Sequence, residues 1–191
     1  MGGRTGGSAL RLLAISGSAR RASTNTAMLR AVAEVAPPGI EITVFDRVCG
    51  LPVFSPDLEE GPPPAPVQTF MEAITRADGL IVASPEYVHA IPGGLKNAID
   101  WLVSGEHIIG KPVALMHASH RGENMLAALR LVLSTVTERF APDIFLRLPL
   151  MKMTPEAIME AVGAGAYRDE VLGFLDGFAG YCRATGARPP L

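Results

Sequence analysis

The chain has 191 residues, of which 48% are hydrophobic, and its formal net charge is −2. A chain of this size and composition can bury a sizeable core without disulfides or a structural metal. Acidic and basic residues are mixed along it, which argues against the broad basic surface that nucleic-acid binding requires. We therefore expect a flexible tail over residues 1–9 and a single domain over residues 10–191.

The cysteines and the apolar runs indicate the compartment. Cys49 and Cys182 stand far apart, without the spacing of a metal site or a redox dithiol. No apolar run is long enough to cross a bilayer, and the first eight residues lack the apolar segment of a secretory signal. These features favour a cytoplasmic protein that has neither a membrane nor a nucleic acid as its partner.

Short apolar runs alternate with amphipathic segments along the chain. Strands are expected at Leu10–Ser16, Ile40–Phe45, Gly79–Ser84, Pro112–His117 and Asp143–Leu148. Helical spacing is found at 28–36, 67–74, 95–102 and 126–136, and further helices are expected from Thr154-Pro155-Glu156 and near 171–182. The stretch 46–66, rich in proline and glycine, is expected to be a long surface loop.

This alternation predicts an α/β fold, with a parallel sheet covered by helices on both faces. In such folds ligands bind beyond the C-terminal ends of the strands. The loops expected to form a site are therefore those after the first, third and fourth strands, at 17–26, 85–94 and 118–124.

The loop after the first strand is rich in groups that bind anions. It joins a strand to a helix start, where unpaired N–H groups and the helix dipole favour a negative charge. Ordinary capping by Ser23 or Thr24 is the alternative, but the density of polar side chains in one turn favours an anion site: Ser18, Arg20, Ser23, Asn25 and Thr26.

The composition of this loop also indicates the kind of phosphate. The loop lacks the lysine of a nucleoside-triphosphate loop and the glycine pattern of a dinucleotide turn. Hydroxyls, amides and arginine suit a terminal phosphate monoester, and flavin mononucleotide (FMN) is such a ligand. A tyrosine-phosphatase loop would need a thiolate, and neither cysteine lies in this turn.

The loop after the third strand carries the family resemblance. It contains Pro85-Glu86-Tyr87 and then Pro92-Gly-x-Leu95-Lys96-Asn97-Ala98-Ile99-Asp100-Trp101, after Gly17-Ser18-x-Arg20-x-x-Ser23-x-Asn25 in the first loop. With these segments in this order, the chain resembles the NADPH-dependent FMN reductase family, which includes chromate and quinone reductases, from about Leu10 to Leu148. The resemblance implies a flavodoxin-like, doubly wound sheet of five parallel strands in the order 2-1-3-4-5, within three layers.

The resemblance also implies roles for individual residues. The FMN phosphate would be held by Ser18, Arg20, Ser23, Thr24, Asn25 and Thr26, and the flavin ring would be lined by Pro85, Glu86, Tyr87, Val88 and His89. The family usually has asparagine where this chain has Val88, so only backbone contact with the ring is carried over there. Tyr87 could instead be a surface aromatic, and Glu86 could form a salt bridge or a subunit contact. Lys96 and Asp100 are expected to be a solvated pair, and Trp101 a core or interface residue.

The loop after the fourth strand is expected to lie against the pyrimidine end of the flavin, through Ser119, His120, Arg121 and Gly122. The family's version is typically richer in glycine, so His120 and Arg121 are a departure from its pattern. We hypothesise that Arg121 stabilises the negative charge that develops near flavin N1 and O2 on reduction, and a solvent-facing arginine is the alternative.

Together these features predict an FMN-dependent NAD(P)H oxidoreductase that reduces quinones, free flavin, metal oxyanions or azo compounds by ping-pong hydride transfer. Hydride transfer needs alignment and not a protein acid or base, so no catalytic residue and no metal are predicted. A homodimer or homotetramer is implied by the resemblance. The alternatives are a flavodoxin-like FMN electron carrier that serves a protein partner, and a flavin-free phosphate-ester hydrolase or sensor.

Overall fold

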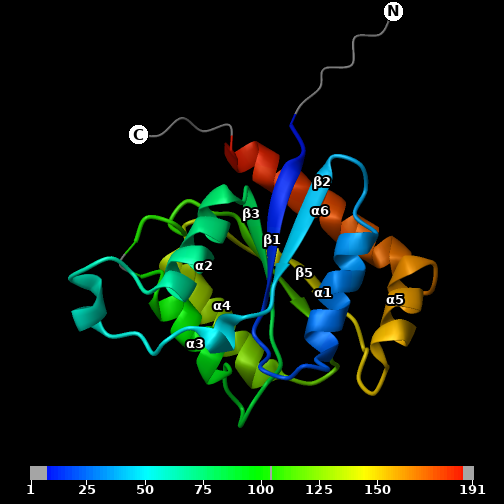
Figure 1. Cartoon of the computed structure of the whole chain (residues 1–191). Coiled ribbons are helices and arrows are strands. Elements are labelled where there is room, and N and C mark those ends of the chain that lie inside the picture. The colour runs from blue at the N-terminus through cyan, green and yellow to red at the C-terminus, as the bar shows by residue number, and fades with distance from the viewer. Residues whose placement is uncertain (1–7, 104, 187–191) are drawn as a thin grey trace, which may run out of the picture.

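The computed structural model describes residues 8–103 and 105–186 and contains a five-stranded parallel sheet (Figure 1). The strands are β1 (Leu10–Ser16), β2 (Ile40–Phe45), β3 (Gly79–Ala83), β4 (Val113–His117) and β5 (Phe140–Arg147). Their order in the sheet is β2-β1-β3-β4-β5, as predicted. Most of the tail expected over residues 1–9 lies outside the described residues.

In the described part of the chain, six α-helices connect and follow the strands. They are α1 (Thr24–Glu34), α2 (Ala65–Arg76), α3 (Gly93–Asp100), α4 (Glu123–Val136), α5 (Pro155–Gly163) and α6 (Arg168–Gly186). Thr154 caps α5 as expected, because its hydroxyl accepts a hydrogen bond from the Ala157 N–H at 3.2 Å. Two short 3₁₀ helices, η1 (Val48–Gly50) and η2 (Pro56–Glu59), lie in the stretch that was predicted as a long loop.

The two faces of the sheet are covered by different sets of helices. Alternate residues of each strand face opposite sides, so Leu12 and Ala14 pack with α1, α5 and α6, whereas Leu13 and Ile15 pack with α2, α3 and α4. The last two helices therefore complete the layer that α1 begins, which the sequence alone did not show. The result is the three-layer arrangement expected for a sheet buried on both faces.

Two predicted elements have different limits. The fifth strand begins three residues before the predicted Asp143, because Phe140 pairs with Val113 before an irregularity in the register. The last helix runs from Arg168 to Gly186, well beyond the predicted 171–182, and buries Val171, Phe178 and Cys182 against the sheet. Packing thus compensates for the low helix propensity of Gly173, Gly177 and Gly180, as expected.

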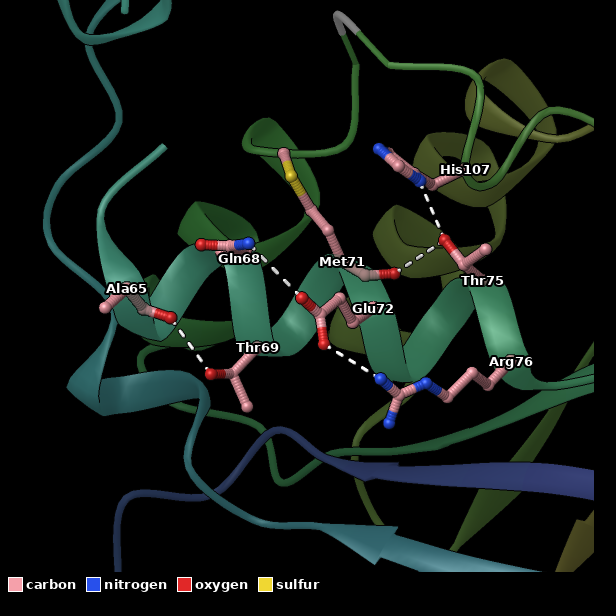
Figure 2. Close-up of polar contacts among 8 residues, drawn as sticks. All are labelled: Ala65, Gln68, Thr69, Met71, Glu72, Thr75, Arg76 and His107. Carbon is pink, nitrogen blue, oxygen red and sulfur yellow. Dashed lines mark hydrogen bonds and ion pairs between the residues drawn. The ribbon is translucent and has the colours of Figure 1, made fainter. Parts of the chain in front are cut away.

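The outward face of α2 is polar (Figure 2). Glu72 accepts hydrogen bonds from Gln68 at 3.3 Å and from Arg76 at 3.0 Å, each one turn away along the helix. Thr75 donates to the Met71 carbonyl at 2.9 Å and also contacts His107 Nδ1 at 2.9 Å. The polar side chains on this face of α2 are thus hydrogen-bonded to one another, to the helix backbone or to His107.

Helix α3 holds the segment after η1 in place. Asn97 accepts a hydrogen bond from the Phe54 N–H at 2.8 Å and donates to the Pro52 carbonyl at 3.0 Å. The indole N–H of Trp101, a residue that is 1% exposed, donates to the same carbonyl at 2.8 Å. Trp101 is therefore a core residue, as expected, and with Asn97 it fixes a stretch that has few regular backbone partners.

We predict that Asn97→Ala lowers the free energy of unfolding by about 2 kcal/mol, because it leaves the Phe54 N–H and the Pro52 carbonyl with fewer partners. Lys96→Ala is the matched control in the same helix. It removes only an exposed ion pair with Asp100, so its expected cost is below about 1 kcal/mol. Urea denaturation of both variants measures the difference, and equal losses would contradict the role assigned to Asn97.

Candidate flavin site at the C-terminal edge of the sheet

The loops after β1, β3 and β4 lie together at the lower edge of the sheet in Figure 1. Parallel strands bring their C-terminal ends to one edge, so segments far apart in sequence become neighbours there. Hydrogen bonds between the loops then fix their relative positions. The sequence-predicted site residues from all three segments are brought together at this edge.

The hydroxyl groups of the first loop are used mainly to build it. Ser23 is the N-cap of α1 and accepts a hydrogen bond from the Thr26 N–H at 3.2 Å. Ser18 accepts one from the Arg20 N–H at 3.2 Å, and Thr26 shares a 2.7 Å hydrogen bond with Ser16. Four of the six residues predicted to hold the phosphate have buried side chains: Ser18, Ser23, Asn25 and Thr26.

The backbone of this loop provides the better anion donors. Within the described part of the chain, the N–H groups of Thr24 and Asn25 have no hydrogen-bond acceptor. The first turn of α1 contains no acidic residue, and Arg20 and Arg21 are exposed beside it. Two free N–H groups at the positive end of a helix, with arginines nearby, suit a phosphate.

Gly17 brings the start of this loop close to the neighbouring elements. Its N–H donates to the Ala83 carbonyl at 2.8 Å, so the chain leaves β1 in contact with the end of β3. A Cβ atom on residue 17 would lie 2.7 Å from both Leu95 Cδ2 and Ser84 Oγ. Glycine therefore leaves room here for the side chains of Leu95 and Ser84.

Asn25 links the first loop to the third. Its Oδ1 accepts a hydrogen bond from the Ala118 N–H at 3.2 Å, across 93 residues of sequence. The residue is 6% exposed, so this contact lies inside the edge of the sheet. The side-chain oxygen of Asn25 thus already accepts a hydrogen bond. Its contact with phosphate stays a prediction, and it would involve the side-chain NH₂ group or the backbone N–H.

The loop after β3 ends in a tight turn. Tyr87 and Ala90 exchange two backbone hydrogen bonds, of 3.2 and 3.0 Å, and the two residues between them, Val88 and His89, have φ angles of 51° and 58°. Tyr87 is 44% exposed and Val88 is 96% exposed. The turn therefore presents an aromatic ring and an apolar side chain to solvent at the mouth of the site.

Glu86 has a structural role that the sequence did not reveal. Its Oε2 accepts a hydrogen bond from the Met125 N–H at 2.9 Å, in the first turn of α4, whose N-cap Gly122 has no side chain to do so. Its other oxygen lies 3.6 Å from His89 Nδ1, and the Asn124 amide donates to the same ring nitrogen at 2.9 Å. Glu86 therefore caps a helix from a different loop, which neither the salt-bridge nor the flavin interpretation anticipated.

The third loop is fixed mostly by its backbone. Ser119 Oγ accepts from the Arg121 N–H at 3.0 Å and donates to Met151 Sδ at 3.0 Å. The side chains of His120 and Arg121 are exposed. The exposure of Arg121 fits both the charge-stabilising role and the solvent-facing alternative, so that role stays a prediction.

His117, the last residue of β4, is the main site-related residue that the sequence analysis missed. It is 1% exposed, and its two ring nitrogens contact the carbonyl oxygens of Ser84 and Arg121. Burial lowers its pKa from the ordinary value of 6.5, although both contacts raise it. The sequence did contain a sign of this role, because His117 stands at the C-terminal end of a strand that was predicted to be buried.

Comparisons with known proteins agree with this geometry. Residues 10–146 match the family described as NADPH-dependent FMN reductase. The quinone reductase of Escherichia coli (strain K12) is 37% identical over 114 residues, which cover 58% of this chain and 60% of that protein. An NAD(P)H-dependent FMN reductase of Pseudomonas aeruginosa is 42% identical over 113 residues, again with 58% and 60% covered.

A solved structure resembles the chain over most of its length. The flavoenzyme NAD(P)H:(acceptor) oxidoreductase FerB from Paracoccus denitrificans superposes with a TM-score of 0.74 at 22% identity, and covers 92% of this chain and 98% of that one. The fold is therefore of the flavodoxin-like class, with its candidate site at the edge where the strands end. The chain belongs to the NADPH-dependent FMN reductase family, although it spans only about 60% of the length of the curated relatives above.

Two further features of the described residues bear on the site. They contain no group of three or more His, Cys, Asp or Glu side chains that could hold a metal ion. They also contain no helix with the length and apolar character needed to cross a bilayer. Lys96 and Asp100 form the exposed ion pair that their spacing predicted.

We predict that Val88→Asn raises the free energy of unfolding by about 0.5–1 kcal/mol, because asparagine adopts positive φ more readily than a β-branched residue. Val53→Asn is the control, since Val53 is 81% exposed but is not among the residues with positive φ. Thermal denaturation of both variants checks this. A gain in both, or in neither, would show that the turn at Val88 is not strained.

Proposed function

We propose that the chain binds FMN and uses it to pass electrons from NAD(P)H to small acceptors, namely quinones, free flavin, metal oxyanions or azo compounds. The observation that carries this proposal is the pair of free N–H groups at the start of α1, at the same edge of the sheet as an aromatic turn from the β3–α3 loop. The N–H groups suit a phosphate monoester, and the aromatic turn suits a planar ring.

The residues of the site fit FMN in two places. Thr24 and Asn25 would donate backbone hydrogen bonds to the phosphate, with Ser18, Ser23 and Thr26 shaping the loop and Arg20 adding charge. The ring would lie between the Pro85–His89 segment and the Ser119–Gly122 loop. Gly122 in that loop has a φ angle of 105°, which a residue with a side chain rarely adopts, and the space beside it is filled by His117.

Hydride transfer to a flavin does not require an acid or a base from the protein. Bound FMN would supply a ring that accepts a hydride from the nicotinamide and later passes two electrons to an acceptor. The chain would orient that ring through its loops, leave one face open beside the exposed Tyr87, and place Arg121 where negative charge develops. Donor and acceptor would then use the same face in turn, which is a ping-pong mechanism.

The relatives support the choice of acceptor class. Among the proteins similar to this chain are quinone reductases and an FMN reductase, by their own names. We extend this to a homodimer or homotetramer, as the family resemblance implies, and to a cytoplasmic location, which the spacing of the two cysteines favours. The remaining alternative is an FMN electron carrier for a protein partner, which would bind FMN but would not be reduced by NADPH alone.

An absorption spectrum of the purified protein with added FMN, before and after anaerobic NADPH, tests the function. We expect about one FMN per chain, visible absorption that NADPH alone bleaches, and parallel lines when initial rates are plotted at varied donor and quinone. FMN binding without bleaching by either NADPH or NADH would favour the electron carrier. A protein that binds no FMN would contradict the proposal.

We also predict that Gly17→Ala weakens FMN binding at least about tenfold, because its new methyl group must displace the loop from Leu95 and Ser84. Gly50→Ala is the matched control, since a Cβ atom there meets nothing within 4 Å. Quenching of FMN fluorescence gives both dissociation constants. Equal affinities for the two variants would argue against the phosphate role of this loop.

A further inference from the structure

One buried ring joins the two loops that would hold the flavin ring. His117 Nδ1 lies 3.0 Å from the carbonyl oxygen of Ser84, at the start of the β3–α3 loop. Its Nε2 lies 2.5 Å from the carbonyl oxygen of Arg121, in the β4–α4 loop. The imidazole is 1% exposed, so water does not compete for these contacts.

Both partners of the ring are hydrogen-bond acceptors. A neutral imidazole has one N–H and can donate to only one of the two carbonyl oxygens, while its other nitrogen faces the second oxygen without a proton. An imidazolium can donate to both. The two loops are therefore bridged by two hydrogen bonds only when the ring carries two protons.

Burial and the neighbouring groups act on this second proton in opposite directions. Burial lowers the pKa of His117 most, whereas the carbonyl groups of Arg121 and Ser84 raise it. Arg147 of β5 lowers the same pKa and Glu123 of α4 raises it, and these two side chains form an ion pair of 2.6 Å. Burial thus favours the neutral form of His117 in the free protein.

The other charged groups near His117 belong to the same two loops. Glu86 lies beyond Gly122, since a Cβ atom on residue 122 would be 2.7 Å from His117 Nε2 and 3.8 Å from Glu86 Cβ. Glu86 is engaged with the Met125 N–H and lies near His89, while His120 and Arg121 are exposed. Because residue 122 is a glycine, the imidazole of His117 can lie against the backbone of the β4–α4 loop.

We propose, on the basis of the proposed function, that His117 is a positioning residue that sets the spacing of the two flavin-facing loops and binds a proton when FMN binds. FMN must fit between the two loops, so its binding favours the doubly protonated imidazole of His117, which bridges both loops. The negative charge of FMN at the same edge favours that form as well. Proton binding and FMN binding are then linked, and each strengthens the other.

Nuclear magnetic resonance of the protein labelled with ¹⁵N-histidine tests this directly. The chain has four histidines, and His117→Gln identifies the signals of His117 by their loss. We expect the pKa of His117 to be below its ordinary value in the free protein and to rise by at least about one unit when FMN is bound, which corresponds to about a tenfold coupling. The titration itself uses the wild-type chain, and the variant serves only to assign the signals of His117.

The dissociation constant of FMN gives a second readout. As the pH falls from about 8, the wild type should gain FMN affinity relative to His117→Gln, which cannot bind the proton. The gain should approach about tenfold once the pH lies below the pKa of His117 in the free protein. The phosphate of FMN titrates near pH 6, but its effect is common to both proteins and cancels in their ratio. His107→Gln is the matched control, because His107 contacts Thr75 on the outward face of α2 (Figure 2) and should leave the wild-type pH dependence unchanged.

The outcomes separate the two proposals. A raised pKa of His117 in the FMN complex, with loss of the affinity gain in His117→Gln only, supports the inference. A pKa that stays unchanged or falls on FMN binding overturns it, as does an equal loss in His107→Gln, while the proposed function stands. Failure of the wild type to bind FMN at any pH overturns the proposed function and this inference together.

Discussion

Backbone N–H groups at the start of a helix need an acceptor, and the candidate site depends on how two helices meet this requirement. At α4 the Met125 N–H is satisfied by a carboxylate, because Glu86 reaches across from the β3–α3 loop, and Glu123 adds an acidic residue to the first turn. At α1 the N–H groups of Thr24 and Asn25 have no acceptor within the described residues, and no acidic residue lies in the first turn. The start of α4 thus already has carboxylates beside it, whereas the first turn of α1 has only the neutral Ser23 hydroxyl on its Thr26 N–H and is open to an anion.

The same division applies to the polar side chains around the site. Most of those that look like ligands in the sequence hold one loop against another. Asn25 connects the first loop to Ala118, and Glu86 connects the second loop to α4. The groups left for a ligand are mainly backbone N–H groups and exposed side chains at the mouth, such as Tyr87 and Arg121. Such a frame orients a bound ring without taking part in bond making.

His117 belongs to this frame but differs from the other links, because the number of hydrogen bonds that it can donate depends on its protonation. The hydrogen bonds of Asn25 and Thr26 do not change with pH in the neutral range. A buried titratable ring between two flavin-facing loops therefore introduces a coupling between protons and ligand that the rest of the edge lacks. Arg147 and Glu123 are paired nearby and shift the pKa of His117 in opposite directions. That pKa therefore depends mainly on burial and on the two carbonyl contacts.

The sequence by itself determined the strand positions, the class of fold and the three loops of the site. Those features depend on local apolar patterns and on the rule that parallel strands end at one edge, both of which act over short stretches of chain. Only the tertiary structure decided which polar groups are engaged and which are free. The partners of Asn25, Glu86 and His117 lie 93, 39 and up to 33 residues away, so no local pattern reports them. The placement of α5 and α6 against α1 was decided in the same way, because it depends on which face of the sheet was left to cover.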